Sequence, residues 1–164
     1  MIFLNSKKRK LNNIYSKISE QSKQYFFLKQ KNKDVYFFID FFQINFILIL
    51  WYMKTKNFED KNIDYLINRY IKDLEGLVIE LGGSETSLRK KIRLIIGNFY
   101  GKLYKYSDVF DKIVRKKNTG LKNIIKKDFK SLSDPNFLEK YIKKNISQLM
   151  KLDENEFWNM NFFI

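Results

Sequence analysis

Hydrophobic residues recur along most of this chain at intervals of three, four and seven, which is the spacing of one face of an α-helix. The clearest example runs from Asp60 to Leu81. Its apolar positions are Ile63, Leu66, Ile67, Tyr70, Ile71, Leu74, Leu77, Val78 and Leu81. No stretch alternates apolar and polar residues between hairpin turns, as a half-buried strand would. The pattern therefore predicts an all-α fold: a single compact helical domain of about six or seven helices.

The same spacing, together with capping residues, places the other helices. They are expected at residues 11–28, 35–53, 88–113, 121–129 and 135–150. Gly82 lies where a left-handed glycine ends a helix, and Ser84 or Ser87 can cap the helix that follows. Asp60 and Asp134 are placed to cap the helices that begin beside them.

The two ends of the chain differ in character from its middle. Residues 1–10 end in four consecutive basic residues, and residues 153–164 are rich in Phe and Trp. We therefore expect a basic N-terminal tail at 1–10, a helical domain at 11–152 and an apolar C-terminal tail at 153–164. The apolar tail either docks on the bundle or forms a small exposed end.

The stretch 35–53 is the most apolar part of the chain, and its length is close to that of a bilayer-spanning helix. It contains Asp40, Gln43 and Asn45. An Asp near a bilayer centre costs about 2.5–3.5 kcal/mol even on insertion scales. A helix that is apolar except along one thin polar stripe is typical of the centre of a bundle. We interpret this stretch as a buried core helix; membrane contact and a true span are the alternatives.

The composition excludes most catalytic chemistry. The chain has 164 residues, no Cys and no His, which removes disulfides, thiolates, the usual zinc sites and every His-based nucleophile system. It also lacks both glycine-rich phosphate-binding motifs. Asp73 and Glu80, seven residues apart on one helix, share a solvated face. We expect no cofactor, no metal and no enzymatic activity.

The net charge of +14 suggests anionic partners. A bias towards Lys, Asn, Ile and Phe, with no Ala, accounts for part of this excess. Two clusters could contact lipid or RNA, or simply be solvated: Lys7, Lys8, Arg9 and Lys10, and Arg89, Lys90, Lys91 and Arg93. Most aromatic residues fall on the buried stripes, so we expect no sequence-specific nucleic-acid binding. The start of the chain lacks the apolar run of a secretory signal, which predicts a cytoplasmic protein.

Gly97 and Gly101 lie four residues apart on one face of the helix at 88–113. Each costs about 1 kcal/mol relative to Ala in a helix interior. Two such losses on one face indicate a close approach to the backbone. Either another helix of the same domain packs there, or the face is the floor of a groove for a helix of a partner.

The stretch 73–106 resembles the ubiquinol–cytochrome c chaperone family. The family pattern D-M-D, R-E-M-G-V-G-D, K-x-V-K and F-Y-G-R-x-x-x-Y is similar to four segments here at similar spacing. These are Asp73-Leu74-Glu75, Glu80-Leu81-Gly82, Lys90-Lys91-Ile92, and Phe99-Tyr100-Gly101-Lys102-Leu103 with Tyr106. Leu11 to Tyr15 resembles the opening helix of the family. The family arginines near Gly76 and Ile79 are absent, and Gln43 or Asn45 stands where the family has a His.

The resemblance implies an all-helical assembly factor for the cytochrome bc1 complex, which binds newly made cytochrome b near the ribosome and the membrane. It implies a cytoplasmic location that includes the surface of the inner membrane, and leaves the oligomeric state open. The motif residues are Asp73, Glu80 and Gly82, and the client-binding residues would be Lys90, Gly97, Phe99, Tyr100, Gly101 and Tyr106. The alternative function is a basic helical module that binds RNA or the ribosome.

Overall fold

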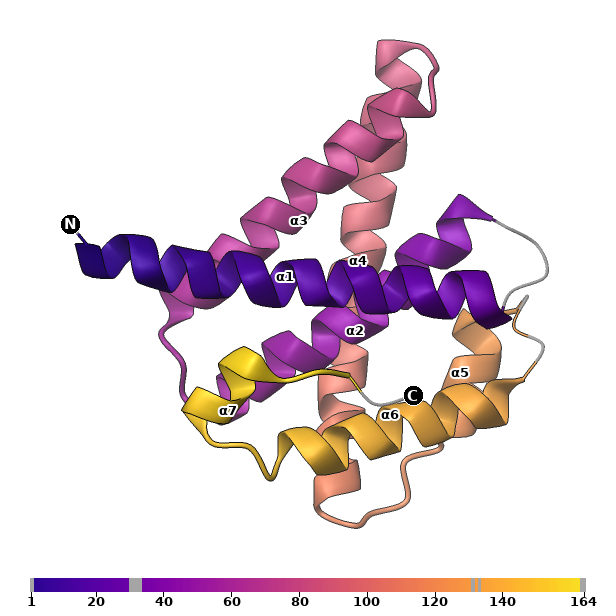
Figure 1. The fold of residues 1–164 in the computed structure, drawn as a ribbon. Helices are drawn as coiled ribbons and strands as arrows, with labels where there is room; N and C mark the ends of the chain where they lie inside the picture. The colour runs from indigo at the N-terminus through magenta and orange to yellow at the C-terminus, as the bar shows by residue number, and fades with distance from the viewer. Residues whose placement is uncertain (1, 30–33, 131, 133, 163–164) are drawn as a thin grey trace.

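The computed structural model describes residues 2–29, 34–130, 132 and 134–162 (Figure 1). Within these residues the chain forms seven α-helices and no strand, which confirms the predicted all-α fold. The helices are α1 (Ile2–Lys29), α2 (Val35–Thr55), α3 (Asp60–Glu80), α4 (Glu85–Val114), α5 (Leu121–Asp128), α6 (Pro135–Leu149) and α7 (Glu154–Asn159).

Helix α2 is the centre of the bundle. Every residue from Phe41 to Met53 is buried, and α1, α3, α4 and α6 pack around the helix. This confirms the interpretation of the stretch as a core helix. Among the described helices α2 is also the one that is long and apolar enough to cross a membrane, but 78% of its most apolar window is buried inside the bundle.

The polar side chains of α2 are satisfied inside the core. Asn45 donates to Oγ of Ser22 over 3.0 Å and accepts a hydrogen bond from the Tyr141 hydroxyl over 2.7 Å. Ser22 donates in turn to the carbonyl of Ile18. Because a buried amide without partners is costly, this chain of bonds is what makes Asn45 tolerable at a position with no solvent exposure. It also fixes how α1, α2 and α6 sit against one another.

Most of the predicted helix ends are correct. Gly82 has φ of 76°, and Ser84 accepts a hydrogen bond from the backbone of Ser87 over 3.3 Å. Asp134 accepts from the backbone ahead of it and caps α6. The predicted cap at Asp60 is wrong, because Asp60 is already the first residue of α3. Its carboxylate is held instead by the Lys54 ammonium at 2.8 Å.

Neither end of the chain forms a separate tail within the described residues. Helix α1 begins at Ile2, so the predicted boundary at residue 11 is wrong. A contact remote in sequence explains the difference: Lys7 pairs with Glu59 in the α2–α3 connection. The Lys10 ammonium also lies 5.9 Å from the centre of the Trp158 ring.

The apolar C-terminal segment docks on the bundle, as one of the two predicted alternatives required. Asp153 caps helix α7 through a capping box with Glu156, and Phe157 and Trp158 are buried. The Phe157 ring stacks on Tyr52 of α2 with 4.7 Å between ring centres, and the Tyr52 hydroxyl donates to the carbonyl of Leu152. Residues 163 and 164 of the predicted tail lie outside the described part of the chain.

Helices α3 and α4 form a hairpin whose closed end projects away from the other helices (Figure 1). Leu74 and Val78 on α3 and Ile95 and Phe99 on α4 are buried. Towards the tip the apolar residues become exposed: Ile79 is 61% and Leu81 47% exposed. The hairpin therefore has one side that is buried and a large side that is exposed to solvent.

Candidate functional site

Helix α4 has two faces of opposite character. Its buried face consists of Ile95, Phe99, Tyr106, Val109 and Phe110. Its open face is also partly apolar, since Leu94 is 64%, Tyr100 47% and Tyr104 84% exposed. These three side chains follow helical spacing with Gly97 and Gly101, so all five residues share one side of α4. We call these five residues the open face of α4.

The two glycines of the open face have empty space above them. A Cβ atom added at Gly97 or at Gly101 would meet nothing within 4 Å. The hypothesis that another helix of this domain packs closely against them is therefore wrong for the part of the chain that the structure describes. The second hypothesis, a surface for a partner, requires an open face, and the empty space above both glycines of this 30-residue helix is compatible with it.

Two of the predicted client-binding residues belong to the core. Phe99 and Tyr106 have no solvent exposure, and the Phe99 ring lies 4.9 Å from Tyr70 and 5.7 Å from Phe46, centre to centre. The pKa of Tyr106 is raised by burial and by the nearby Asp128 carboxylate. The prediction that these two residues bind a client is wrong, because their rings fill the space between α4 and the bundle.

The remaining predicted client-binding residues are accessible. Gly97, Tyr100 and Gly101 lie on the open face. Lys90 is exposed, one helical turn before Leu94 and two turns before Gly97. Lys90, Leu94 and Gly97 follow helical spacing, so Lys90 lies on the same side of α4 as the open face. Of the residues predicted for the client, these four stay together on the surface.

The predicted basic contacts divide into paired and unpaired residues. Arg89 pairs with Glu85 one turn earlier, and Lys7 pairs with Glu59. Lys91 is partly buried, whereas Arg93 is exposed near the open face. The remaining basic residues predicted for lipid or RNA are Lys8, Arg9 and Lys10, all exposed on α1.

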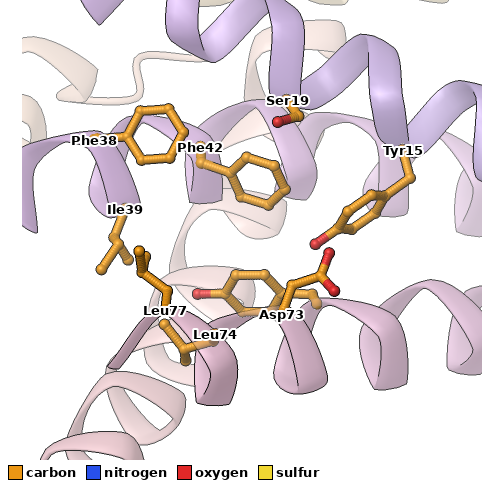
Figure 2. Close-up of a pocket in the computed structure, with 9 residues that line it drawn as sticks. Tyr15, Ser19, Phe38, Ile39, Phe42, Asp73, Leu74 and Leu77 are labelled. Carbon is orange, nitrogen blue, oxygen red and sulfur yellow. The ribbon is translucent and has the colours of Figure 1, made fainter. Parts of the chain in front are cut away.

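The motif residue Asp73 connects α3 to α1. It borders a cavity of about 120 Å³ that Phe38, Phe42 and Leu77 help to line. In Figure 2 the Tyr15 hydroxyl points towards the Asp73 carboxylate. Burial raises the pKa of Tyr15 most, and the Asp73 carboxylate raises it further.

An arginine completes this contact between α1 and α3. The Arg69 guanidinium lies 4.6 Å from the centre of the Tyr15 ring, and its Nε is 3.9 Å from Oδ2 of Asp73. Arg69 also donates to Oδ1 of Asn12. Two segments that resemble the chaperone family, 11–15 and 73–75, are therefore neighbours in space. Asp73 has a structural contact, while Glu80 and Gly82 lie exposed at the hairpin tip.

A second polar network was missed by sequence reasoning. Lys102 of α4 is largely buried and donates to the Asp40 carboxylate and, over 3.0 Å, to Oε1 of Gln43. Gln43 donates to the Tyr70 hydroxyl over 2.7 Å. Burial raises the pKa of Asp40, and Lys102 opposes that rise. The signal for this network was the thin polar stripe on α2, which required a partner on a facing helix.

No metal site is evident in the described residues, because no three His, Cys, Asp or Glu side chains gather closely enough to hold an ion. Comparison of the chain with protein-family models, with curated proteins and with solved structures found no match.

Proposed function

We propose that this protein is an assembly chaperone that holds newly made cytochrome b during biogenesis of the bc1 complex. The observation that carries the proposal is the open face of α4. Exposed apolar residues are ordinary when scattered singly, but a contiguous apolar patch marks an interaction site. Leu94, Tyr100 and Tyr104 are exposed along one side of α4, and we infer that they form such a patch; the end of α4 that joins α3 projects from the bundle (Figure 1).

The chemistry of the open face suits a helix of a membrane protein. Tyrosine supplies a large apolar ring with little loss of side-chain entropy, which is why it is enriched at the centres of interfaces. Gly97 and Gly101 add a strip without side chains, over which the backbone of another helix can approach closely. Small residues serve this purpose where membrane helices pack together.

The identity of the client comes from the resemblance of residues 73–106 to the chaperone family. Cytochrome b is a membrane protein, so its apolar segments need cover between synthesis and insertion. Lys90 and Arg93 lie beside the apolar patch and are free to approach anionic lipid or the ribosome. In this proposal the apolar part of the face binds the client, and the basic residues at its edge contact the ribosome or the membrane surface where the client is made.

The replacement of Gly101 by Leu tests the proposal. The added side chain points into empty space, so the fold should be unchanged by circular dichroism. It should block the approach of a client helix and lower the amount of cytochrome b that accumulates in cells. Gly76 provides the matched control, because it is also a helix glycine with nothing within 4 Å of an added Cβ, but on α3. Gly76→Leu should leave cytochrome b unchanged.

Normal accumulation of cytochrome b with Gly101→Leu would overturn the proposal. So would equal losses in the Gly101→Leu and Gly76→Leu variants, since these would reflect a general effect on the hairpin and not a client surface.

A second candidate function, a module that binds RNA or the ribosome, is favoured by the distribution of charge. Residues 112–151 contain 12 Lys and Arg but only 3 Asp and Glu. Binding of this kind should weaken steeply as salt is raised, because it releases counterions. It should also be indifferent to Gly101→Leu, and this combination of results would favour it over the chaperone.

A further inference from the structure

A hollow of about 760 Å³ lies where the end of α2 and the start of α3 meet the middle of α4. Its apolar lining comes from Leu50, Trp51, Ile63 and Leu103. Trp51 is buried at the end of the core helix, and its ring packs edge-on against Phe110 with 5.5 Å between centres. We call this hollow the α2–α3–α4 cleft.

The cleft is acidic on a strongly basic molecule. Three carboxylates line it, from Asp60, Asp64 and Asp111. Asp60 is paired with Lys54, which also lines the cleft. Asp111 accepts a hydrogen bond from Nε1 of Trp51 over 2.8 Å, and among the described residues neither Asp111 nor Asp64 forms an ion pair. In a chain with 32 basic and 18 acidic residues, three carboxylates and a single lysine line this apolar hollow, so its charge is opposite to that of the whole molecule.

The cleft and the open face of α4 lie along the same helix. Tyr100, Tyr104, Ser107 and Asp111 follow one another at intervals of four, three and four, so they form one stripe along α4. Ser107 and Asp111 line the cleft, and the two tyrosines belong to the open face. A polypeptide that lies along this stripe would therefore meet aromatic rings first and carboxylates afterwards.

We propose that the α2–α3–α4 cleft binds a polypeptide segment that places an apolar side chain beside two or more Lys or Arg residues. The apolar side chain would fill the hollow over Trp51 and Leu103, and the cations would pair with Asp64 and Asp111. Membrane proteins carry such segments where an apolar span meets a cytoplasmic loop, because those loops are enriched in Lys and Arg. The assignment of this segment to the client rests on the proposed function. The chemistry of the segment that the cleft would bind is inferred from the lining of the cleft alone.

A synthetic peptide tests the cleft without the client. The probe is a fluorescein-labelled peptide with a central Leu-Leu pair and two Lys residues on each side, and its counterpart has Glu in place of every Lys. Binding to the full chain is measured by fluorescence anisotropy. The Lys peptide should bind, and more weakly as salt is raised, because partly exposed charges are screened. The Glu peptide should not bind.

The double variant Asp64→Asn with Asp111→Asn removes both charges and keeps an acceptor for Trp51. It should weaken binding of the Lys peptide about tenfold, because two partly exposed ion pairs are lost. The matched control is Asp108→Asn, an exposed carboxylate on α4 that pairs with Lys112 outside the cleft; it should not change the affinity. The single variant Asp64→Asn should change the logarithm of Kd by at least about a third of the change in the double variant. Because Asp64 is an exposed carboxylate without a hydrogen bond, this variant controls for a folding defect caused by the substitution at Asp111.

Equal affinity of the double variant and the unaltered chain would overturn the proposal, as would equal binding of the Glu peptide. A dimer in sedimentation that the double variant dissolves would also overturn it, because a second copy would then occupy the cleft. If the Lys peptide binds as expected but Gly101→Leu leaves cytochrome b unchanged, the cleft stands and the proposed function fails.

Discussion

Replacement of Gly97 and Gly101 by Ala should make this protein more stable. Both glycines are interior to α4, where Gly is about 1 kcal/mol less favourable than Ala. An added Cβ meets nothing within 4 Å at either position, so no steric cost opposes the gain. The double variant should therefore gain about 2 kcal/mol in free energy of unfolding, which for a chain of this size raises Tm by about 4–8 °C.

Urea unfolding followed by circular dichroism measures this gain. The midpoint should rise while the slope with denaturant stays constant, because the surface exposed on unfolding is unchanged. Gly76→Ala should give about half the gain, since it is one open helix glycine of the same kind. Gly82→Ala should lose about 1–2 kcal/mol instead, because Gly82 has φ of 76° and an L residue is strained there.

A loss of stability in the double alanine variant would refute the reasoning. It would mean that something packs against the glycines in solution and that the open face of α4 is not open. If the face serves a client, the double alanine variant should gain stability and lose client binding. If the fold needs the glycines, the same variant should lose both stability and client binding.

Three other predictions follow from the core and the ends of the chain. Asn45→Ala removes two buried hydrogen bonds and leaves a cavity, so it should cost about 2–4 kcal/mol in urea unfolding. Phe157→Ala should cost about 3–5 kcal/mol, because its ring is fully buried; an unchanged midpoint would show that α7 is not docked in solution. Lys61 and Lys7 lower the pKa of the Glu59 carboxyl from 4.5 to about 2, so its contribution to stability is complete above pH 4.5 and is lost as the pH falls towards 2. Glu59→Gln should flatten this part of the stability curve, and a curve that is unchanged would contradict the pairing.

Periodicity and capping residues were sufficient to predict α2 to α6. The long apolar pattern of α3, the left-handed glycine at 82 and the caps at Ser84 and Asp134 are local signals, and local hydrogen bonds decide where a helix begins and ends. The core position of α2 was also predictable, because three polar residues in an apolar run require polar partners that a bundle supplies and a bilayer does not.

The ends of the chain could not be predicted, because their contacts join residues far apart in sequence. The ion pair between Lys7 and Glu59 and the stacking of Phe157 on Tyr52 leave no local signal. A short apolar or basic terminus is therefore predicted as a tail unless the surface on which it packs is known.

The candidate site shows which kind of sequence evidence was the better guide. Phe99 and Tyr106 share helical spacing with Ile95 and Phe110, which is the pattern of an apolar stripe, and all four are buried. The resemblance to a family suggested instead that Phe99 and Tyr106 contact a client, because a motif does not distinguish residues that hold the core from residues that face a partner. For Gly97 and Gly101 neither guide sufficed: spacing shows that two residues share a face, but only the packed structure shows which side that face is on.

The stacking of Phe157 on Tyr52 has a consequence for how this protein is made. The Tyr52 hydroxyl donates to the carbonyl of Leu152, 100 residues later in the chain. At a synthesis rate of about 5–20 residues per second, the end of α2 waits about 5–20 s for the helix that covers it. During that interval an aromatic surface of the growing chain is exposed next to other growing chains. A protein proposed to shelter a nascent polypeptide would thus pass through the same exposed state that it relieves in its client.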